Sequence, residues 1–347
     1  MMAFEVRAAR TEGEVAQAYE VATRVFGPNY HESRATKDRM LRLEPPTDLR
    51  DLLVAVAGDE VVGVLRIVDR DVELGSGVAR VGGITTGAVR PDFRRSGCGW
   101  KLFEASIERS RERGDLLSIG FARRAMDGYY PRLGYVGLGG HVKNTYTVPS
   151  AQGDNPAIVT AFDPELIGAY GAAYDNTYGG LTMRFMRTTS WWASLRDRSP
   201  WLRADGFVTV MVEDTPAGYY VEHGGTVMEA AWLPGQMPLV ASAVLAGARA
   251  RRSELSTSLS PSHPLSATLA ALNHTTSMRR AWDGGHIVRI VDRDGLAALL
   301  AEHCSADERA AWRSFDVRSH VDARNLLMLA AAGSMSSPPV WSELDAL

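Results

Sequence analysis

The chain has 347 residues, of which 45% are hydrophobic and 23% are charged, and its formal net charge is -3. This length suits about two domains of ordinary size, and a near-neutral charge lacks the basic excess that binding to nucleic acid requires. No apolar run approaches the roughly 20 residues of a membrane helix, and the first residues do not resemble a signal peptide.

The cysteine content points to a reduced environment. Only Cys98 and Cys304 occur, which is too few for a disulfide framework and too isolated for a zinc site. We therefore expect a cytoplasmic protein with no metal and with no membrane or nucleic-acid partner.

The first half of the chain alternates between helical and strand patterns. Apolar side chains at helical spacing predict a helix over 12–26, and the loop that follows contains His31. Valine-rich segments predict two strands, 51–59 and 60–71, joined by a hairpin turn at Gly58 and Asp59.

The next predicted strand, 79–89, contains Gly82, Gly83 and Gly87, which indicate a bulge or the close approach of another group. A helix ending at Arg113 should follow, because Gly114 suits the end of a helix. The remaining elements expected in this half are a buried strand, a short helix with a turn and a closing strand, over 116–122, 126–135 and 141–148.

The pattern of the second half predicts the same order of elements without a repeat of the sequence. We predict a mixed α/β fold with two similar domains in tandem: 1–150, a linker over 151–163, and a degenerate second copy over 164–347. Helices are expected over 164–174, 184–195, 238–252 and 264–274, and strands over 205–214, 217–225, 226–232, 254–260 and 284–292.

The segment RPDFRRSGCGWK, residues 90–101, has two possible roles. It could bind a phosphate group through backbone N–H groups where a helix begins, or it could be a helix start with exposed arginines. The second interpretation accounts for the charge but not for Gly97 and Gly99, because glycine in a first turn weakens a helix. The fingerprints of dinucleotide folds and of nucleotide phosphate loops are both absent.

Five elements in order resemble the core of the GCN5-related N-acetyltransferase (GNAT) superfamily. They are Val89-x-Pro91 closing a bulged strand, Arg94-x-x-Gly97-x-Gly99, the helix to Arg113, the strand 116–122, and Tyr130-x-Arg132-Leu133-Gly134-Tyr135. The length and the second half are similar to tandem-domain actinobacterial aminoglycoside acetyltransferases and to N-acyltransferases of antibiotic pathways. One departure is that the aminoglycoside enzymes usually have a third, sterol-carrier-like domain, for which 285–347 is too short.

This resemblance implies acetyl-CoA or a longer acyl-CoA as co-substrate. The N–H groups of the turn would hold its pyrophosphate, and an N–H near the split in the strand would polarise the thioester carbonyl. Tyr130 would protonate the leaving thiolate, although it could instead be a buried aromatic residue like Tyr129. The cofactor-binding residues implied in this way are Val89, Arg94, Arg95, Ser96, Gly97, Cys98, Gly99 and Trp100.

Cys98 is not expected to form a covalent acyl-enzyme, because only arginines lie near it in the sequence and no base is available. Candidates for the general base are His31, His223 beside Glu222, and the terminal carboxylate of Leu347; a chain of water molecules could also serve. His31 is also a candidate for contact with the acceptor.

Trp191 and Trp192 could stack on an acceptor ring or belong to the core. The second half has no paired glycines or arginine ahead of its helix, so we expect it to bind no coenzyme.

The resulting hypothesis is an N-acyltransferase that moves an acetyl or longer acyl group directly to a primary amine of a small molecule. An amino sugar of an aminoglycoside or glycopeptide antibiotic is the first candidate acceptor. The alternatives are acetylation of protein lysines or amino termini, and a non-catalytic protein that senses coenzyme A or binds a partner. Homo-oligomer formation is left open.

Overall fold

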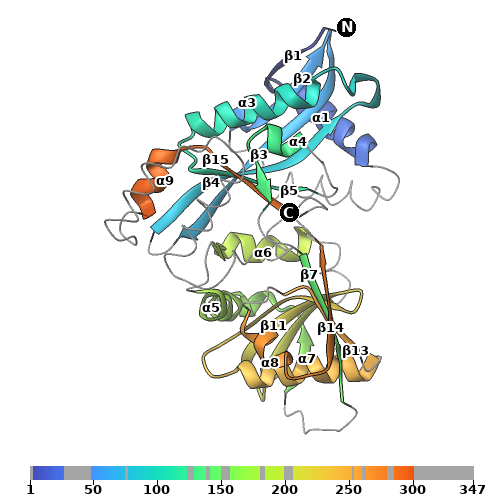
Figure 1. Ribbon diagram of the computed structural model, residues 1–347, viewed down its shortest axis with the longest axis vertical. Helices are drawn as coiled ribbons and strands as arrows, with labels where there is room; N and C mark the ends of the chain where they lie inside the picture. Colours follow the sequence, from blue (N-terminus) through green and yellow to red (C-terminus); the bar gives the residue numbers. More distant parts are fainter. Residues whose placement is uncertain are drawn as a thin grey trace. The chain divides into compact units, whose positions relative to one another are not determined.

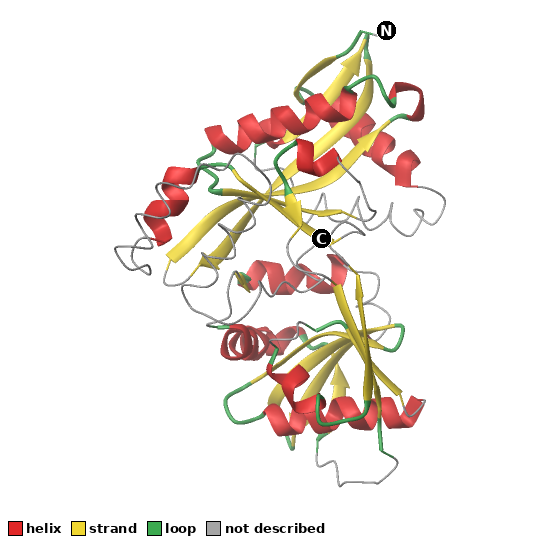
Figure 2. Cartoon of the chain, in the orientation of Figure 1, coloured by secondary structure: helices red, strands yellow, loops and turns green. Residues whose placement is uncertain are grey.

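The computed structural model describes residues 3–26, 48–74, 77–122, 129–137, 141–149, 157–179, 184–198, 206–251, 254–259, 263–279 and 285–300. The chain forms two compact units, each built around its own sheet (Figures 1 and 2). Unit 1 comprises residues 1–138 and 284–330, and unit 2 comprises 139–283 and 331–347.

The sheet of unit 1 is mixed and has the strand order β1-β2-β3-β4-β5-β15-β6. Its neighbours are antiparallel except for β4 and β5, which run parallel. The strands are β1 Glu5–Ala8, β2 Leu52–Ala57, β3 Glu60–Leu74, β4 Gly77–Val89, β5 Leu117–Ala122, β6 Val136–Gly137 and β15 Gly285–Ile290.

Helices cover both faces of this sheet because β2 and β3 present apolar side chains alternately to each side. One face packs against α1, and the other packs against α3 in a core that includes Leu65, Leu102 and Tyr135. The helical elements of unit 1 are α1 Glu12–Phe26, η1 Leu49–Asp51, η2 Pro91–Phe93, α3 Cys98–Glu112, α4 Tyr129–Arg132 and α9 Arg293–Leu300.

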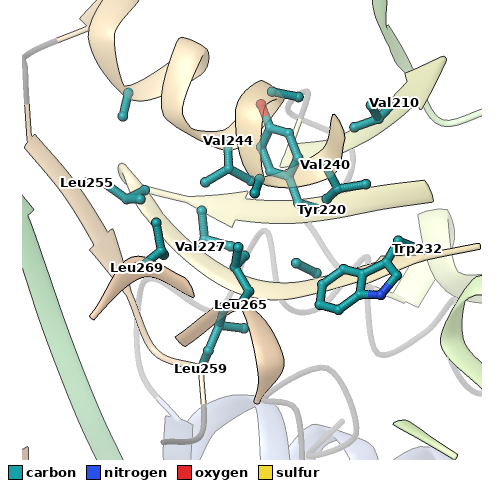
Figure 3. Packing of buried hydrophobic residues seen from close by; sticks show 14 of the residues in the cluster. Val210, Tyr220, Val227, Trp232, Val240, Val244, Leu255, Leu259, Leu265 and Leu269 are labelled. Atoms are coloured by element: carbon teal, nitrogen blue, oxygen red, sulfur yellow. The ribbon is translucent and has the colours of Figure 1, made fainter. Parts of the chain in front are cut away.

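The sheet of unit 2 has the order β14-β7-β13-β12-β11-β10-β8, with β12 and β13 as its parallel pair. Figure 3 shows its apolar core, in which Tyr220 and Trp232 of the sheet pack with Val240 and Val244 of α7. The elements are β7 His141–Thr147, β8 Ile158–Ala161, η3 Pro164–Leu166, α5 Ile167–Tyr178, β9 Arg184–Phe185, α6 Thr189–Arg198, β10 Phe207–Val212, β11 Thr215–His223, β12 Thr226–Trp232, α7 Met237–Arg251, β13 Glu254–Thr257, α8 Pro264–Leu269 and β14 His274–Arg279.

The two sheets exchange one strand. In unit 1, β15 lies between β5 and β6, and in unit 2, β7 lies between β13 and β14. Yet β7 directly follows β6 in the sequence, and β15 directly follows β14. Each strand therefore completes the sheet of the other part of the chain.

This exchange corrects the expected role of 141–148 as the closing strand of the first domain. Tyr146 of β7 is opposite Leu255 of β13 and His274 of β14. A strand pattern in the sequence specifies which side chains share a face, but it does not identify the partner strand. The expected boundary near residue 150 differs from the structural one for the same reason.

Three further differences concern single elements. The predicted linker contains β8, which pairs with β10. The helix expected over 264–274 ends at Leu269, and the unpredicted strand β14 begins at His274. The helix expected from 184 begins only at Thr189. The mixed α/β fold class itself is confirmed, as are the predicted helix α1, the hairpin of β2 and β3, and the helix α3.

The exchanged strand predicts that a fragment containing only residues 1–150 cannot form unit 1. It lacks β15, so the backbone groups of β5 and β6 that bond to this strand lose their partners. We expect a fragment of 1–150 to show no cooperative urea transition by circular dichroism. A second fragment, joining 1–138 to 284–300 through a flexible linker, is the control and should regain the transition; cooperative unfolding of 1–150 by itself would contradict the prediction.

Candidate functional site

The central feature of unit 1 is the divergence of β4 from β5. The two parallel strands pair only where residues 81–84 face 117–120. Beyond that point β4 contains a bulge, in which Thr86 and Gly87 oppose the single residue Leu65 of β3. A bulge bends its strand, so the second half of β4 turns away from β5. The bulge expected in this glycine-containing strand is confirmed.

The residue at the bulge with a left-handed backbone is Thr86, with a φ of 59°, and not the neighbouring Gly87. A β-branched residue rarely adopts this conformation, since it costs on the order of 1–2 kcal/mol. Sequence analysis missed this feature because glycine is the usual signal for a positive φ. The surrounding ladder must hold Thr86 in place, which indicates that the bend is a fixed part of the fold.

The bend leaves the backbone of Val89 facing the gap between the strands. The N–H of Arg90 donates to the carbonyl of Val62 on β3 at 2.9 Å. Because successive backbone groups point to opposite edges of a strand, the N–H of Val89 points to the other edge, from which β5 has diverged. It is a hydrogen-bond donor that no described strand uses.

The turn after β4 is organised by its own side chains. Arg90 forms ion pairs with Glu60 at 2.7 Å and with Asp92 at 2.6 Å. The hydroxyl of Ser96 donates to the carbonyl of Phe93 at 2.6 Å and accepts from the N–H of Cys98 at 3.4 Å. These contacts stabilise the turn and leave the exposed side chains of Arg94 and Arg95 available to solvent.

The start of α3 has the backbone geometry of an anion site. Arg95 and Gly97 both have left-handed backbones, with φ values of 63° and 87°, and Gly97 is the N-cap. Turns of this kind gather N–H groups into a concave surface that favours anions. The first regular helical bond is from the N–H of Lys101 to the carbonyl of Gly97, so the N–H groups of Gly99 and Trp100 have no partner within the helix.

Aromatic side chains of α4 lie against this first turn. If Gly99 carried a Cβ, that atom would lie 3.0 Å from the hydroxyl oxygen of Tyr129 and 3.7 Å from a methyl carbon of Val89. Glycine at this position therefore allows α4, α3 and the end of β4 to approach one another closely. Tyr130 is the next residue along α4, and burial raises the pKa of its phenol.

Cys98 is a core residue. Its side chain is buried, and a Cβ on Gly63 of β3 would lie 2.9 Å from its sulfur atom. Burial raises the pKa of the Cys98 thiol to about 11. A thiol with this pKa is a poor nucleophile at neutral pH, which agrees with the expectation that Cys98 forms no acyl-enzyme.

Of the three candidates for the general base, the structure describes only His223. His31 and Leu347 lie outside the described residues, so their roles stay predictions. His223 is the last residue of β11 in unit 2 and is exposed. Its role as base also stays a prediction.

The structure places the tryptophan pair in the core, which is one of the two roles that the sequence allowed, and this argues against the other role, contact with the acceptor. Both side chains are in the core of unit 2, where Trp192 packs with Tyr170, Tyr174 and Tyr219. The guanidinium of Arg187 lies 4.3 Å from the ring centre of Trp191 and forms a paired contact with Glu229, at 2.7 Å for each bond. The rings surround a cation of the protein itself, because a buried guanidinium is stabilised by aromatic faces and a carboxylate.

Unit 2 also contains a bulged strand beside a parallel one. On β12, Glu229 and Val227 face adjacent residues of β11, so Met228 is the extra residue. β12 then pairs with β13 only at residues 226 and 227. The backbone plan is the same as in unit 1.

In unit 2, however, side chains occupy the edge of β12 beyond this pairing. The ring of His263 bonds to the carbonyl of Ala230 at 3.0 Å. The N–H of Trp232 donates to the hydroxyl of Thr177, and its carbonyl accepts from Asn176, both at 2.9 Å. These backbone groups are therefore unavailable to a ligand.

The described residues hold no group of three or more His, Cys, Asp or Glu side chains arranged to bind a metal ion. Among the described helices, none is both long and apolar enough to span a bilayer.

Comparison with protein families gives a match within unit 1. Residues 5–137 match the family model of the acetyltransferase (GNAT) domain. This segment contains the bulged strand, the turn, α3 and both tyrosines of α4, so the match to the GNAT model includes the whole candidate site described above. No curated protein matches the sequence.

Solved structures extend the likeness to most of the chain. A GCN5-related N-acetyltransferase from Kribbella flavida is 20% identical, with a TM-score of 0.65 over 86% of this chain and 74% of its own. A second one, from Anabaena variabilis, is 16% identical, with a TM-score of 0.67 over 86% and 75%. Eis1 from Mycobacterium abscessus is 16% identical, with a TM-score of 0.59 over 86% and 76%. At these identities the likeness establishes the GNAT fold and not the substrate.

The left-handed backbone of Gly97 yields a prediction about ligand binding. Replacing Gly97 by Ala should cost about 1 kcal/mol of stability and distort the N–H groups before α3, so affinity for coenzyme A should fall as measured by calorimetry. Gly114 is the matched control, because it has a φ of 74° at the other end of the same helix and also has open space around it. Gly114→Ala should lose similar stability and keep its affinity; equal affinity in both variants would contradict an anion site at Gly97.

The burial of His263 in unit 2 predicts a dependence of stability on pH. Burial lowers the pKa of His263 from 6.5 to about 4. The unfolded chain therefore binds the proton more tightly than the folded chain. The contribution of His263 to the free energy of unfolding is complete above pH 6.5 and is lost as the pH falls toward 4. Between pH 7 and pH 5 this loss should be about 2 kcal/mol in urea unfolding, and His263→Gln should lose about 2 kcal/mol less over that interval. An unchanged pH dependence in the variant would show that His263 is not the titrating group.

Proposed function

We propose that the chain is an acyl-CoA-dependent N-acyltransferase whose reaction takes place in unit 1. The observation that carries this proposal is the juxtaposition of three features: the diverging strand β4, the left-handed turn before α3, and the tyrosines of α4. The GNAT match over residues 5–137 includes all three. GNAT enzymes take the acyl group from acyl-CoA, and no step proposed here requires a metal.

The described residues suit an acyl-CoA in two respects. The N–H groups at the start of α3 would hold its diphosphate, with Arg94 and Arg95 adding positive charge nearby. The gap between β4 and β5 would admit the pantetheine arm, since the edge of β4 near Val89 offers unused backbone groups. The corresponding edge in unit 2 is occupied by side chains, so we expect one acyl-CoA per chain.

The proposed reaction is direct transfer. The N–H of Val89 polarises the thioester carbonyl, and the neutral amine of the acceptor attacks the acyl carbon. The carbon–sulfur bond breaks, Tyr130 gives its proton to the departing thiolate, and the amine releases a proton to a base or to water. Tyr130 is suited to this step because burial keeps its phenol protonated.

For the acceptor we propose a primary amine of a small molecule, with an amino sugar of an antibiotic as the first candidate. This part rests on the resemblance of the sequence to tandem-domain aminoglycoside acetyltransferases. One assay tests both the acceptor and the acyl group. Acetyl-CoA or decanoyl-CoA is incubated with amino sugars and with peptides, and the products are identified by mass spectrometry. Acylation of peptides alone would favour a protein acetyltransferase.

Replacing Tyr130 by Phe separates an enzyme from a protein that only binds coenzyme A. Loss of the proton donor should lower kcat about 10²-fold, while the dissociation constant of coenzyme A, measured by calorimetry, should change little. If turnover is unchanged, Tyr130 is not the acid. If the unmodified protein does not bind coenzyme A, the proposed function is wrong.

The pH profile of kcat gives a second readout of the same residue. The acid form of Tyr130 is required, and its pKa is raised above the usual value of about 10. Activity should therefore not decline between pH 7 and pH 9, and a decline within that interval would contradict the role of Tyr130 as the acid.

A further inference from the structure

We propose that the hydroxyl of Tyr129 donates a hydrogen bond to the diphosphate of acyl-CoA at the first turn of α3. This inference rests on the proposed function, because it concerns the same ligand. It assigns different tasks to two adjacent tyrosines: Tyr129 binds the co-substrate, and Tyr130 acts on the leaving thiolate.

The position of the hydroxyl is the first argument. It lies 3.0 Å from the point where a Cβ of Gly99 would be, beside the free N–H groups of Gly99 and Trp100. An anion held by these N–H groups would lie within reach of the hydroxyl. The side chain of Val89 borders the same point at 3.7 Å, so the hydroxyl is located where the anion site meets the end of β4.

The packing of the ring is the second argument. Tyr129 makes edge-to-face contacts with Trp100, Phe103 and Tyr130, at ring-centre distances of 6.3, 5.8 and 5.4 Å. These contacts fix the direction of the ring and involve only its carbon edges and faces. Phenylalanine would make the same contacts, so packing does not account for the hydroxyl.

The lack of a protein partner is the third argument. Within the described part of the chain, no residue forms a hydrogen bond with the hydroxyl of Tyr129, whereas the hydroxyl of Tyr135 bonds to Ser118 at 2.7 Å. Burial also raises the pKa of Tyr129 and keeps it a donor. A half-buried hydroxyl is stabilised by an acceptor, and a phosphate oxygen at the first turn would supply one with a negative charge.

The test compares three tyrosine-to-phenylalanine variants with three ligands. Tyr129→Phe removes the proposed donor, Tyr130→Phe removes the proposed acid, and Tyr135→Phe removes a buried hydroxyl with a known protein partner. The ligands are coenzyme A, dephospho-coenzyme A, which keeps the diphosphate, and pantetheine, which lacks it. Affinities are measured by calorimetry, with displacement of coenzyme A for weak binding.

We expect Tyr129→Phe to bind coenzyme A and dephospho-coenzyme A about tenfold more weakly, as for the loss of a hydrogen bond to a charged group. Its affinity for pantetheine should equal that of the unmodified protein. Tyr130→Phe and Tyr135→Phe should keep their affinities for all three ligands. Thermal unfolding of each variant checks that the fold is retained.

The other outcomes each overturn a distinct statement. If the unmodified protein binds coenzyme A and Tyr129→Phe binds it equally well, the inference is wrong and the proposed function stands. If the loss also appears with pantetheine, or disappears with dephospho-coenzyme A, the hydroxyl does not contact the diphosphate. If the unmodified protein binds none of the ligands, the proposed function fails and the inference fails with it.

Discussion

The pairing of β4 with β5 over only residues 81–84 is the constraint on which the candidate site depends. At the start of β5, the N–H of Leu116 bonds to the carbonyl of Arg80 at 2.9 Å. The buried Asp115 also lies 3.1 Å from Arg113 at the end of α3. One end of the parallel pair is thus fixed, and the bulge at Thr86 bends β4 away at the other. The fixed end and the bend together expose the backbone of Val89 beside the start of α3.

Unit 2 has the same arrangement of a bulged strand that diverges from a parallel neighbour, but there side chains bond to the edge of the bulged strand. The bulged strand is β12, and His263, Thr177 and Asn176 bond to its edge. A buried backbone group without a partner is costly, so the edge of a diverging pair is satisfied by side chains, by water or by a ligand. In unit 2 the protein supplies the partners, whereas in unit 1 no described strand pairs with the edge of β4 beyond residue 84.

Local features of the sequence were sufficient for the elements that carry the site. The apolar spacing of α1, the valine-rich hairpin and the glycines of the turn each reflect a local backbone preference. Sequence analysis could not identify the exchange of β7 and β15, because strand partners are chosen by contacts between distant parts of the chain. It also left open whether Trp191 and Trp192 bind an acceptor or belong to the core, since nothing local shows that Arg187 pairs with Glu229 and lies over the ring of Trp191.

The exchange also links the tyrosines to the rest of the chain. α4 lies between β5 and β6 in sequence, and these two strands are not neighbours: Val288 of β15 lies between Ile119 of β5 and Val136 of β6. The spacing of β5 and β6 therefore depends on a strand that follows residues 139–283 of unit 2 in the sequence. Because α4 is anchored at both ends by those strands, the positions of Tyr129 and Tyr130 beside α3 require β15 to be in place. A site encoded within residues 5–137 thus depends on a strand beyond residue 284, which a local motif cannot reveal.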